Sequence, residues 1–322
     1  MTLIHTFMLG RLRCHALEGG IQRLDGGAMF GVVPKPLWER RAPPDAKNRI
    51  TLGLRCLLVE HPDGLVLIDT GLGNKEDAKF MEIYGIENEG RNGPTQLEDA
   101  MAEAGYRPED VRTVINTHLH FDHAGGNTVR RSGSVAVRQE GAGGGVADRH
   151  SATPPLRLAF PNATYVVQSG DLDFARHANE RTRASYLPHN YEPVAQAGRF
   201  RLLEGDSEVM PGISVRLVPG HVPFLQGVLL QSGPDALFYP ADLIPTRHHL
   251  PLPWIMGYDV EPLRTLESKR ALVRTAAEQG WWIYFEHDPD VIMGRLRPAE
   301  RGVELVDQVP SPVAQTTPPN PR

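Results

Sequence analysis

The segment from Thr117 to Gly126 concentrates side chains that can bind metal ions. Within six residues it holds His118, His120, Asp122 and His123. Imidazole and carboxylate groups are the ligands that zinc and similar first-row metals take in proteins. On an extended backbone the first three share one side, and His123 lies on the other. The segment therefore predicts a metal site and has the donors to serve two adjacent metals.

Four predicted strands each end just before a metal-capable residue. Apolar runs predict these strands over residues 111–117, 213–218, 236–239 and 281–285. The histidine-rich segment, His221, Asp242 and His287 follow them in that order. Sites in α/β sheets gather beyond the carboxyl ends of strands, so we expect these residues to meet. Asp69, at the end of an earlier strand, is expected to support a ligand histidine.

The other predicted elements alternate between strands and helices. Further strands are expected over residues 11–24, 54–60, 65–69, 164–168, 200–203 and 227–230. Helices are expected over residues 95–104, with Thr95 in a capping box, from about Ser169, and over 261–279, with Pro262 in its first turn. Residues 176–191 are polar and aromatic and are expected to cover the site.

Glycine and proline mark the predicted turns and loops. Asp25-Gly26-Gly27 predicts a turn, and residues 28–38, which contain two prolines, predict an apolar loop rather than a helix or strand. Gly125-Gly126 predicts a tight turn. The glycines at 141 and 143–145 lack a phosphate-loop lysine and predict a flexible loop.

The composition is that of a soluble globular protein. The 322 residues include 40% hydrophobic and 23% charged residues, and the net charge of −5 argues against a nucleic-acid partner. Two cysteines, Cys14 and Cys56, cannot build a disulfide framework and are expected to be buried in a reducing compartment. No signal peptide or membrane-length apolar run is visible, so a cytoplasmic protein without membrane contact is expected. We expect one domain over residues 1–309 and a disordered tail over 310–322.

The pattern closely resembles the metallo-β-lactamase superfamily, whose HxHxDH motif stands here at residues 118–123. The resemblance covers about residues 50 to 290 and implies an α/β fold, an αββα sandwich of two mixed β-sheets flanked by helices. It implies two divalent metal ions per chain, with zinc expected and manganese, iron or cobalt as alternatives. It further implies one metal on His118, His120 and His221, a second on Asp122, His123 and His287, and Asp242 as the bridge between them.

Three flanking segments resemble the branch that includes quorum-quenching N-acyl-homoserine lactonases. These are residues 24–35, 241–246 and 281–288. The resemblance implies that a metal-bridging hydroxide opens a lactone ring, with Asp122 carrying a proton to the leaving alcohol. The best-known lactonases have a tyrosine where this chain has Pro245, and Tyr258 is the candidate substitute. The candidates for an acyl-chain surface are Met29, Phe30, Trp38, Trp254 and Met256.

Alternatives remain at this stage. Hydrolysis of an organophosphate triester, or of another ester or thioester, needs the same site and an apolar small-molecule pocket. A metal-binding protein without catalysis is the alternative from another class, and the presence of all seven predicted ligands favours an enzyme. The apolar loop near the N-terminus is compatible with a homodimer. Among the other histidines, His248 and His249 are expected to have structural or surface roles.

Overall fold

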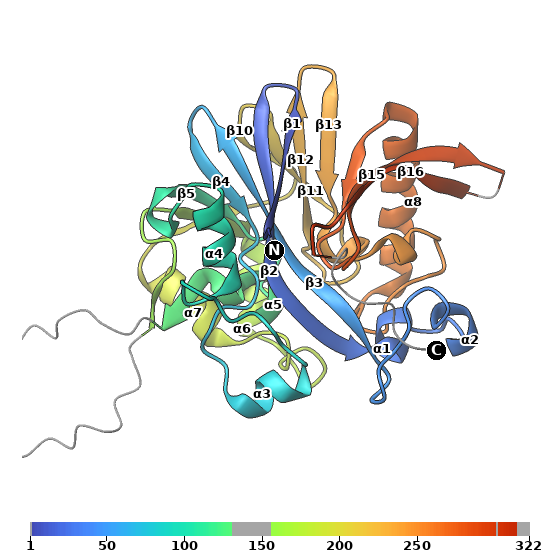
Figure 1. The fold of residues 1–322 in the computed structure, drawn as a ribbon, viewed down its shortest axis with the longest axis horizontal. Coiled ribbons are helices and arrows are strands. Elements are labelled where there is room, and N and C mark those ends of the chain that lie inside the picture. Colours follow the sequence, from blue (N-terminus) through green and yellow to red (C-terminus); the bar gives the residue numbers. More distant parts are fainter. Residues whose placement is uncertain (1, 131–155, 301, 314–322) are drawn as a thin grey trace, which may run out of the picture.

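Two seven-stranded sheets form the centre of the protein (Figure 1). The computed structural model describes residues 2–130, 156–300 and 302–313. The first sheet contains β1 (Ile4–Leu9), β2 (Leu12–Asp25), β3 (Arg49–His61), β4 (Gly64–Ile68), β5 (Val111–Ile115), β8 (Thr164–Gln168) and β9 (Phe200–Leu203), in this spatial order. The second contains β10 (Ser207–Met210), β11 (Ile213–Leu217), β12 (Gln226–Ser232), β13 (Asp235–Tyr239), β14 (Trp282–Tyr284), β15 (Val291–Ala299) and β16 (Gly302–Pro310). A small third sheet pairs β6 (Thr128–Arg130) with β7 (Leu156–Leu158).

Both large sheets contain parallel and antiparallel pairs. The parallel pairs bring together the strand ends from which the site is built. In the first sheet β4, β5, β8 and β9 are parallel neighbours, and in the second β13 and β14 are parallel. The other adjacent pairs are antiparallel. The carboxyl ends of β4 and β5, and of β13 and β14, therefore lie next to each other within their sheets.

Helices cover the outer faces of the two sheets (Figure 1). The helices are α1 (Gly26–Phe30), α2 (Lys35–Trp38), α3 (Ala78–Ile83), α4 (Gln96–Glu103), α5 (Phe121–Ala124), α6 (Ser169–Arg176), α7 (Pro188–Gln196) and α8 (Pro262–Gln279). Short 3-10 helices are η1 (Pro108–Asp110), η2 (Gly125–Asn127), η3 (Ala241–Leu243) and η4 (Arg247–His249). Helices α4, α6 and α7 lie on the side of the first sheet and α8 on that of the second, which gives the predicted αββα sandwich.

The main core lies between the two sheets. Val59 of β3, Val66 of β4 and Val215 of β11 are all fully buried in one apolar cluster that also contains Val228 and Phe238. Each such side chain contributes about 1.5–3 kcal/mol when it is removed from water. Cys14 lies in the same cluster, and both cysteines are free and buried, as predicted. Within the described part of the chain, no helix combines the length and apolar character that a membrane crossing requires.

The region from residue 25 to 38 departs from the prediction. The predicted turn and loop are two short helices, α1 and α2. Asp25 caps α1 by accepting a hydrogen bond from the Ala28 backbone nitrogen, at 2.8 Å. Pro36 lies in the first turn of α2, where a proline costs no hydrogen bond. Trp38 and Phe30 stack at 5.4 Å between ring centroids, so apolar packing rather than helix propensity holds this region.

β1 at the N-terminal end and two strands near the C-terminal end were not predicted. Residues 281–285 were the last predicted strand, but β15 and β16 follow and form a long antiparallel hairpin. The folded part extends past residue 309, because β16 ends at Pro310 and Ser311 is buried, with its hydroxyl donating to Glu18. The predicted flexible loop at 141–145 lies outside the described residues. Other predicted strands and helices appear within a few residues of their expected bounds.

Candidate metal centre

The histidine-rich segment joins a strand of the first sheet to a one-turn helix. β5 ends at Ile115, and the chain then continues through His118 and His120 to α5. His120 is the residue that precedes this helix, and Asp122 and His123 lie on it. The segment is therefore extended only in its first half, and the helical turn brings Asp122 and His123 together. The strict alternation predicted for Asp122 was wrong for this reason.

The glycine pair after the helix serves close packing rather than a tight turn. Gly125 has φ −58°, and neither glycine has a positive φ. A Cβ atom on Gly125 would lie 2.3 Å from the Leu72 carbonyl oxygen, and one on Gly126 would lie 2.0 Å from that of Thr70. The loop after β4 thus lies directly against the segment, which only glycine permits here.

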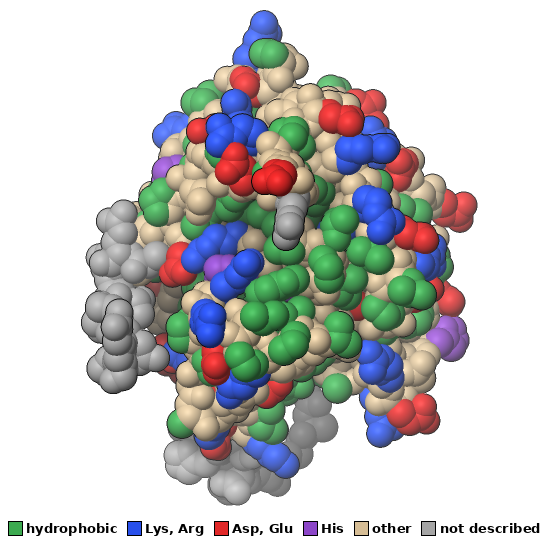
Figure 2. Space-filling model, turned by 90° about the vertical axis from the view of Figure 1, so that its right-hand side faces the viewer, with side chains coloured by type: hydrophobic (Ala, Val, Ile, Leu, Met, Phe, Trp, Pro, Cys, Tyr) green, Lys and Arg blue, Asp and Glu red, His purple; other side chains and the backbone are tan. Residues whose placement is uncertain are grey.

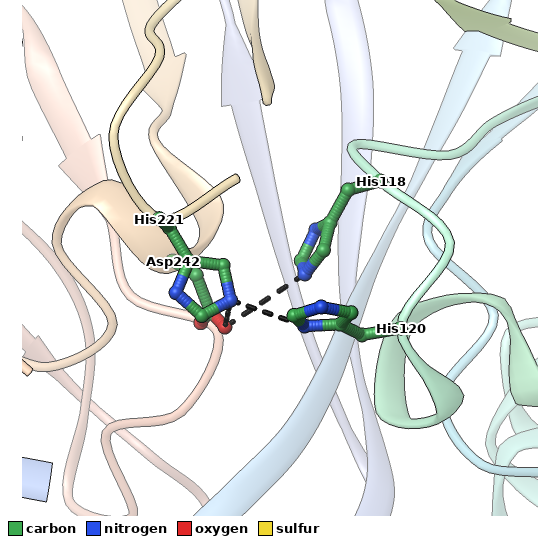
Figure 3. Close-up of side chains that lie close together, drawn as sticks. All are labelled: His118, His120, His221 and Asp242. Atoms are coloured by element: carbon green, nitrogen blue, oxygen red, sulfur yellow. Dashed lines mark hydrogen bonds and ion pairs between the residues drawn. The ribbon is translucent and has the colours of Figure 1, made fainter. Parts of the chain in front are cut away.

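All seven predicted metal ligands come together, in two groups. The ligand atoms of His118, His120, His221 and Asp242 lie within 4.8 Å of one another, as do those of Asp122, His123 and His287. Figure 3 shows the first group, with His118 and His120 from the β5 side facing His221 and Asp242 from the second sheet. The site is thus built at one edge where the two sheets meet.

Asp242 contacts histidines of both groups. Its Oδ2 lies 3.0 Å from His221 Nε2 and 3.5 Å from His123 Nε2, and its Oδ1 lies 3.2 Å from His287 Nε2. Asp242 lies on η3, directly after Ala241, which has a positive φ of 47°. A non-glycine residue in this conformation carries strain, and such strain often occurs at functional sites. The fold therefore places one carboxylate between the two groups.

Carboxylates behind the histidines fix the orientation of their rings. Asp69 Oδ2 lies 3.1 Å from His123 Nδ1, and Asp69 accepts hydrogen bonds from the Thr117 backbone and hydroxyl at 2.8 and 2.7 Å. Asp259 lies 3.0 Å from His221 Nδ1. Each carboxylate accepts the ring N–H and leaves Nε2 free to face the centre. Asp69 thus has the predicted supporting position, whereas Asp259 was not predicted.

Asp171 holds the backbone between the first two histidines. Its carboxylate accepts a hydrogen bond from the Leu119 nitrogen at 2.8 Å and another from the Tyr186 hydroxyl at 3.0 Å. The Tyr186 ring also packs edge-on against His120, with centroids 4.6 Å apart. Burial raises the pKa of Asp171 to about 7. Residues 176–191 therefore do cover the site, as their composition indicated.

The donors fit metal ions and are poorly satisfied without them. His120 Nδ1 lies 3.1 Å from His221 Nε2, and His123 Nε2 lies 3.2 Å from His287 Nε2, so imidazole nitrogens face each other in pairs. The Nε2 atom of His118 is buried and has no hydrogen-bond partner in the described chain. Burial and the neighbouring histidines lower the pKa of His118, which keeps this nitrogen free to bind a cation. Five imidazoles with carboxylates form a donor set suited to zinc, manganese, iron or cobalt.

A cavity of about 380 Å³ opens onto the two groups. Its floor is polar, with His120, Asp122, His221, Asp242 and His287 among the lining residues. Its other walls include the side chains of Gln22, Leu24, Met29, Leu52, Tyr84, Phe121, Arg181, Met256, Tyr258 and Val260. A polar floor under largely apolar walls is typical of a site for a small apolar substrate.

The predicted substrate-contacting residues divide into two sets. Met29, Met256 and Tyr258 line the cavity, and the Tyr258 side chain is 39% exposed. Burial and nearby groups that include Asp122 raise the pKa of Tyr258 to about 12, so its hydroxyl keeps its proton. Phe30, Trp38 and Trp254 do not line the cavity, because they pack on one another behind it, and their prediction as substrate contacts was wrong.

His249, which lies near the site, has structural partners. His249 stacks on Phe30 at 4.8 Å and is hydrogen-bonded to the Met29 carbonyl oxygen at 2.8 Å. This is the structural role that we expected for it. Sequence reasoning missed Gln22, Asp171, Asp259 and Glu286, which lie around the centre. Only the position of Glu286, directly before a ligand candidate, gave a signal.

A second hollow lies on a different face. Figure 2 shows this face, where hydrophobic side chains gather at the centre among charged ones. A hollow of about 580 Å³ is lined there by residues of α8, the β15–β16 hairpin and the segment 250–253. It contains Arg270, Arg274 and Glu278 but no metal-capable cluster from the described residues.

The fold and the site define a class of protein. Residues 53–138 match the model of the metallo-beta-lactamase superfamily. A probable metal-dependent hydrolase from Staphylococcus aureus superposes with a TM-score of 0.79 at 25% identity, over 93% of this chain and 98% of the other. Residues 53–138 thus carry a metallo-beta-lactamase domain match, and the chain is a metal-dependent hydrolase similar to members of that superfamily.

Lactonases are among its relatives. An N-acyl homoserine lactonase from a Bacillus species is 28% identical over 247 residues, which are 74% of this chain and 82% of that protein. AidC, a dizinc quorum-quenching lactonase solved with a product, superposes with a TM-score of 0.71 at 20% identity, over 94% of this chain and 96% of the other. The second likeness concerns the fold alone.

Proposed function

We propose that the protein is a dinuclear metal hydrolase that opens a lactone ring, with N-acyl-homoserine lactones as the substrate class. One observation carries this proposal. Two groups of metal-capable residues share Asp242 at the floor of an apolar-walled cavity. The similarity to N-acyl homoserine lactonases over most of both chains supports the choice of bond.

The two groups would hold the two metals. His118, His120 and His221 would bind the first, and Asp122, His123 and His287 the second, with Asp242 reaching both. When bound, divalent metals supply an activated water at neutral pH and polarise a carbonyl oxygen. Zinc is the first choice, because five imidazoles and two carboxylates suit it, and manganese, iron and cobalt are compatible with the same donors.

The chain's own residues then manage the proton and the substrate. Ring opening adds water across the ester bond: the carbonyl carbon gains an oxygen, and the ring oxygen leaves as an alcohol. Asp122 lines the cavity and would pass a proton to that leaving oxygen. Tyr258 keeps its hydroxyl proton and would donate a hydrogen bond to the carbonyl oxygen as negative charge develops there.

The cavity walls suit a neutral substrate with an acyl chain. Met29, Leu52 and Met256 provide apolar contact area, and among the described residues Arg181 is the sole charged group of the wall outside the polar floor. Removal of apolar surface from water contributes about 25 cal/mol per Å² to binding. A neutral organophosphate triester also suits these walls, and it is the competing substrate to test.

A substrate panel tests the proposal. The zinc-loaded protein is assayed on N-acyl-homoserine lactones, aryl phosphotriesters and a glutathione thioester, beside His118→Ala and the exposed-site control His177→Ala. We expect the lactones to be turned over fastest, activity to be lost in H118A, and H177A to behave as wild type. Lactone turnover no faster than that of free zinc would refute the lactonase proposal. If a phosphotriester were turned over fastest, phosphotriesters would replace lactones as the proposed substrate class.

A further inference from the structure

Glu286 is a buried carboxylate that nothing in the predicted site uses. It lies between β14 and His287, and its side chain is fully buried. Neither of its carboxylate oxygens has a hydrogen-bond partner in the described part of the chain. An ionised carboxylate without partners in a protein interior costs several kcal/mol, so its presence requires a compensating interaction.

Glu286 lies against the back of a proposed metal ligand. Glu286 Oε2 lies 3.1 Å from His123 Nδ1. Asp69 Oδ2 lies at the same distance of 3.1 Å from that nitrogen and accepts a hydrogen bond from it. Two carboxylates therefore face one ring N–H.

The two carboxylates are not equivalent. Asp69 is held by the Thr117 backbone and hydroxyl, and it already fixes the ring orientation of His123. Glu286 has no such support and adds a second negative charge at the same place. Its contribution is therefore electrostatic rather than orientational. That charge acts through the imidazole on whatever is bound at Nε2, which faces the other ligands.

We propose that Glu286 tunes the binding of the second metal: its negative charge behind His123 raises the affinity of the Asp122–His123–His287 group for a divalent cation. This inference rests on the proposed function, because it assumes that this group binds metal. Loss of an outer partner of a metal ligand typically lowers metal affinity 10- to 100-fold.

The proposal predicts that replacing Glu286 weakens zinc binding but does not lower the thermal stability of the metal-free protein. In Glu286→Gln the second equivalent of zinc should bind 10 to 100 times more weakly. The metal-free protein should not lose thermal stability, because the substitution removes a buried charge without a hydrogen bond. Glu18→Gln is the matched control: Glu18 is also buried but is paired with Arg55 at 2.8 Å. E18Q should lower the Tm of the metal-free protein and leave zinc affinity unchanged.

The experiment is a zinc titration against a chromophoric chelator, with thermal unfolding of the metal-free proteins. Weakened binding of the second zinc with an unchanged or higher Tm supports the proposal. Unchanged zinc affinity in E286Q overturns it, and so does a parallel loss of affinity and stability, including failure to fold. Glu286→Asp, which keeps the charge but withdraws it by one methylene, should bind the second zinc more tightly than E286Q. Equally weak binding of the second zinc by E286D and E286Q also overturns the proposal. A wild-type protein that binds fewer than two zinc ions would instead refute the dinuclear function itself.

Discussion

Gln22 donates a 2.5 Å hydrogen bond from its side-chain nitrogen to Oδ2 of Asp122. Gln22 lies on β2 and is fully buried, and both residues line the cavity. The contact links the first antiparallel strands of the chain to the helix that carries Asp122. The contact also fixes the orientation of the Gln22 amide, because a flipped amide would place its oxygen against the Asp122 carboxylate. The position of Asp122 therefore depends on a strand about 100 residues earlier.

Removal of this contact should slow turnover. A hydrogen bond to a charged group contributes about 1.5–3 kcal/mol, so Gln22→Leu should lower kcat for a lactone by about tenfold or more. The measurement is steady-state kinetics with zinc-loaded protein. Gln96→Leu, which removes a hydrogen bond to the Glu18 carbonyl oxygen, serves as the control and should leave kcat unchanged. Equal kcat in Q22L and wild type would show that Gln22 does not position Asp122.

Asp122 itself should be essential for turnover but not for folding. General acid–base groups contribute about 10² to 10⁴ in rate, so Asp122→Asn should reduce kcat by at least about 10²-fold. The circular dichroism spectrum should stay that of the wild type. Asp173→Asn, at an exposed position of α6, should be fully active. If D122N retained wild-type turnover, Asp122 would have no part in proton transfer.

Asp259 should control the metal bound by His221. Its carboxylate lies 3.0 Å from His221 Nδ1 and accepts a hydrogen bond from the Thr265 hydroxyl at 2.7 Å. Asp259→Leu should weaken binding of one zinc by 10- to 100-fold. Asp259→Asn keeps an acceptor for the ring N–H and should recover much of this affinity. Chelator competition measures both variants, and identical affinities in D259L and wild type would contradict the assignment.

Sequence patterns located the candidate metal ligands well because these residues share one structural rule. His118, His221 and Asp242 each follow a strand with buried apolar residues, and such strands are readable in a single sequence. The supporting residues follow no such rule. Gln22 is remote in sequence from Asp122, and Asp259 belongs to an irregular segment before α8. Their contacts arise from the packing of the sheets and loops, which periodicity does not describe.

The helices and strands that the sequence did not predict also depend on contacts made only in the folded protein. β15 and β16 are strands whose exposed positions interrupt the apolar pattern, and they are stabilised by pairing with each other. α1 and α2 are too short to show helical periodicity, and the stacking of Phe30 with Trp38 holds them in place. Tertiary contact decided each of these structures, whereas the longer α4 and α8 carry their own caps and apolar faces.

Lys75 should give the fold a measurable pH dependence. Its amino group is buried against the carbonyl oxygens of Gly125 and Thr128. Burial lowers its pKa from 10.5 to about 7. Between these values the unfolded chain holds a proton that the folded chain has released, so stability should rise with pH across this window.

Lys75→Met removes that proton linkage. The Tm of wild type relative to K75M should therefore increase from pH 7 to pH 10, as measured by thermal unfolding across this range. The exposed Lys79→Met should follow the wild type at every pH. A constant difference between wild type and K75M would show that Lys75 is protonated in the folded protein throughout.

The apolar wall should select for the acyl chain. Met256 is buried and lines the cavity. Burying such a side chain contributes about 1.5–3 kcal/mol, so Met256→Ala should lower kcat/KM for a long-chain lactone by about tenfold. A short-chain lactone should be affected much less. Val32→Ala, at a position that is 91% exposed, should change neither substrate. An equal effect of M256A on both lactones would contradict contact with the chain.

The two groups of ligand candidates come from strands that are far apart in the sequence. His118 follows β5 of the first sheet, whereas His287 follows β14 of the second, 169 residues later in the sequence. Neither sheet alone has the donors for both groups. During synthesis, a ribosome must therefore add every residue through β14 and His287 before the centre can assemble. Hydrolysis would thus report on a chain that extends past His287, and a fragment that stops before β14 would keep the residue 118–123 motif without the donors for both groups.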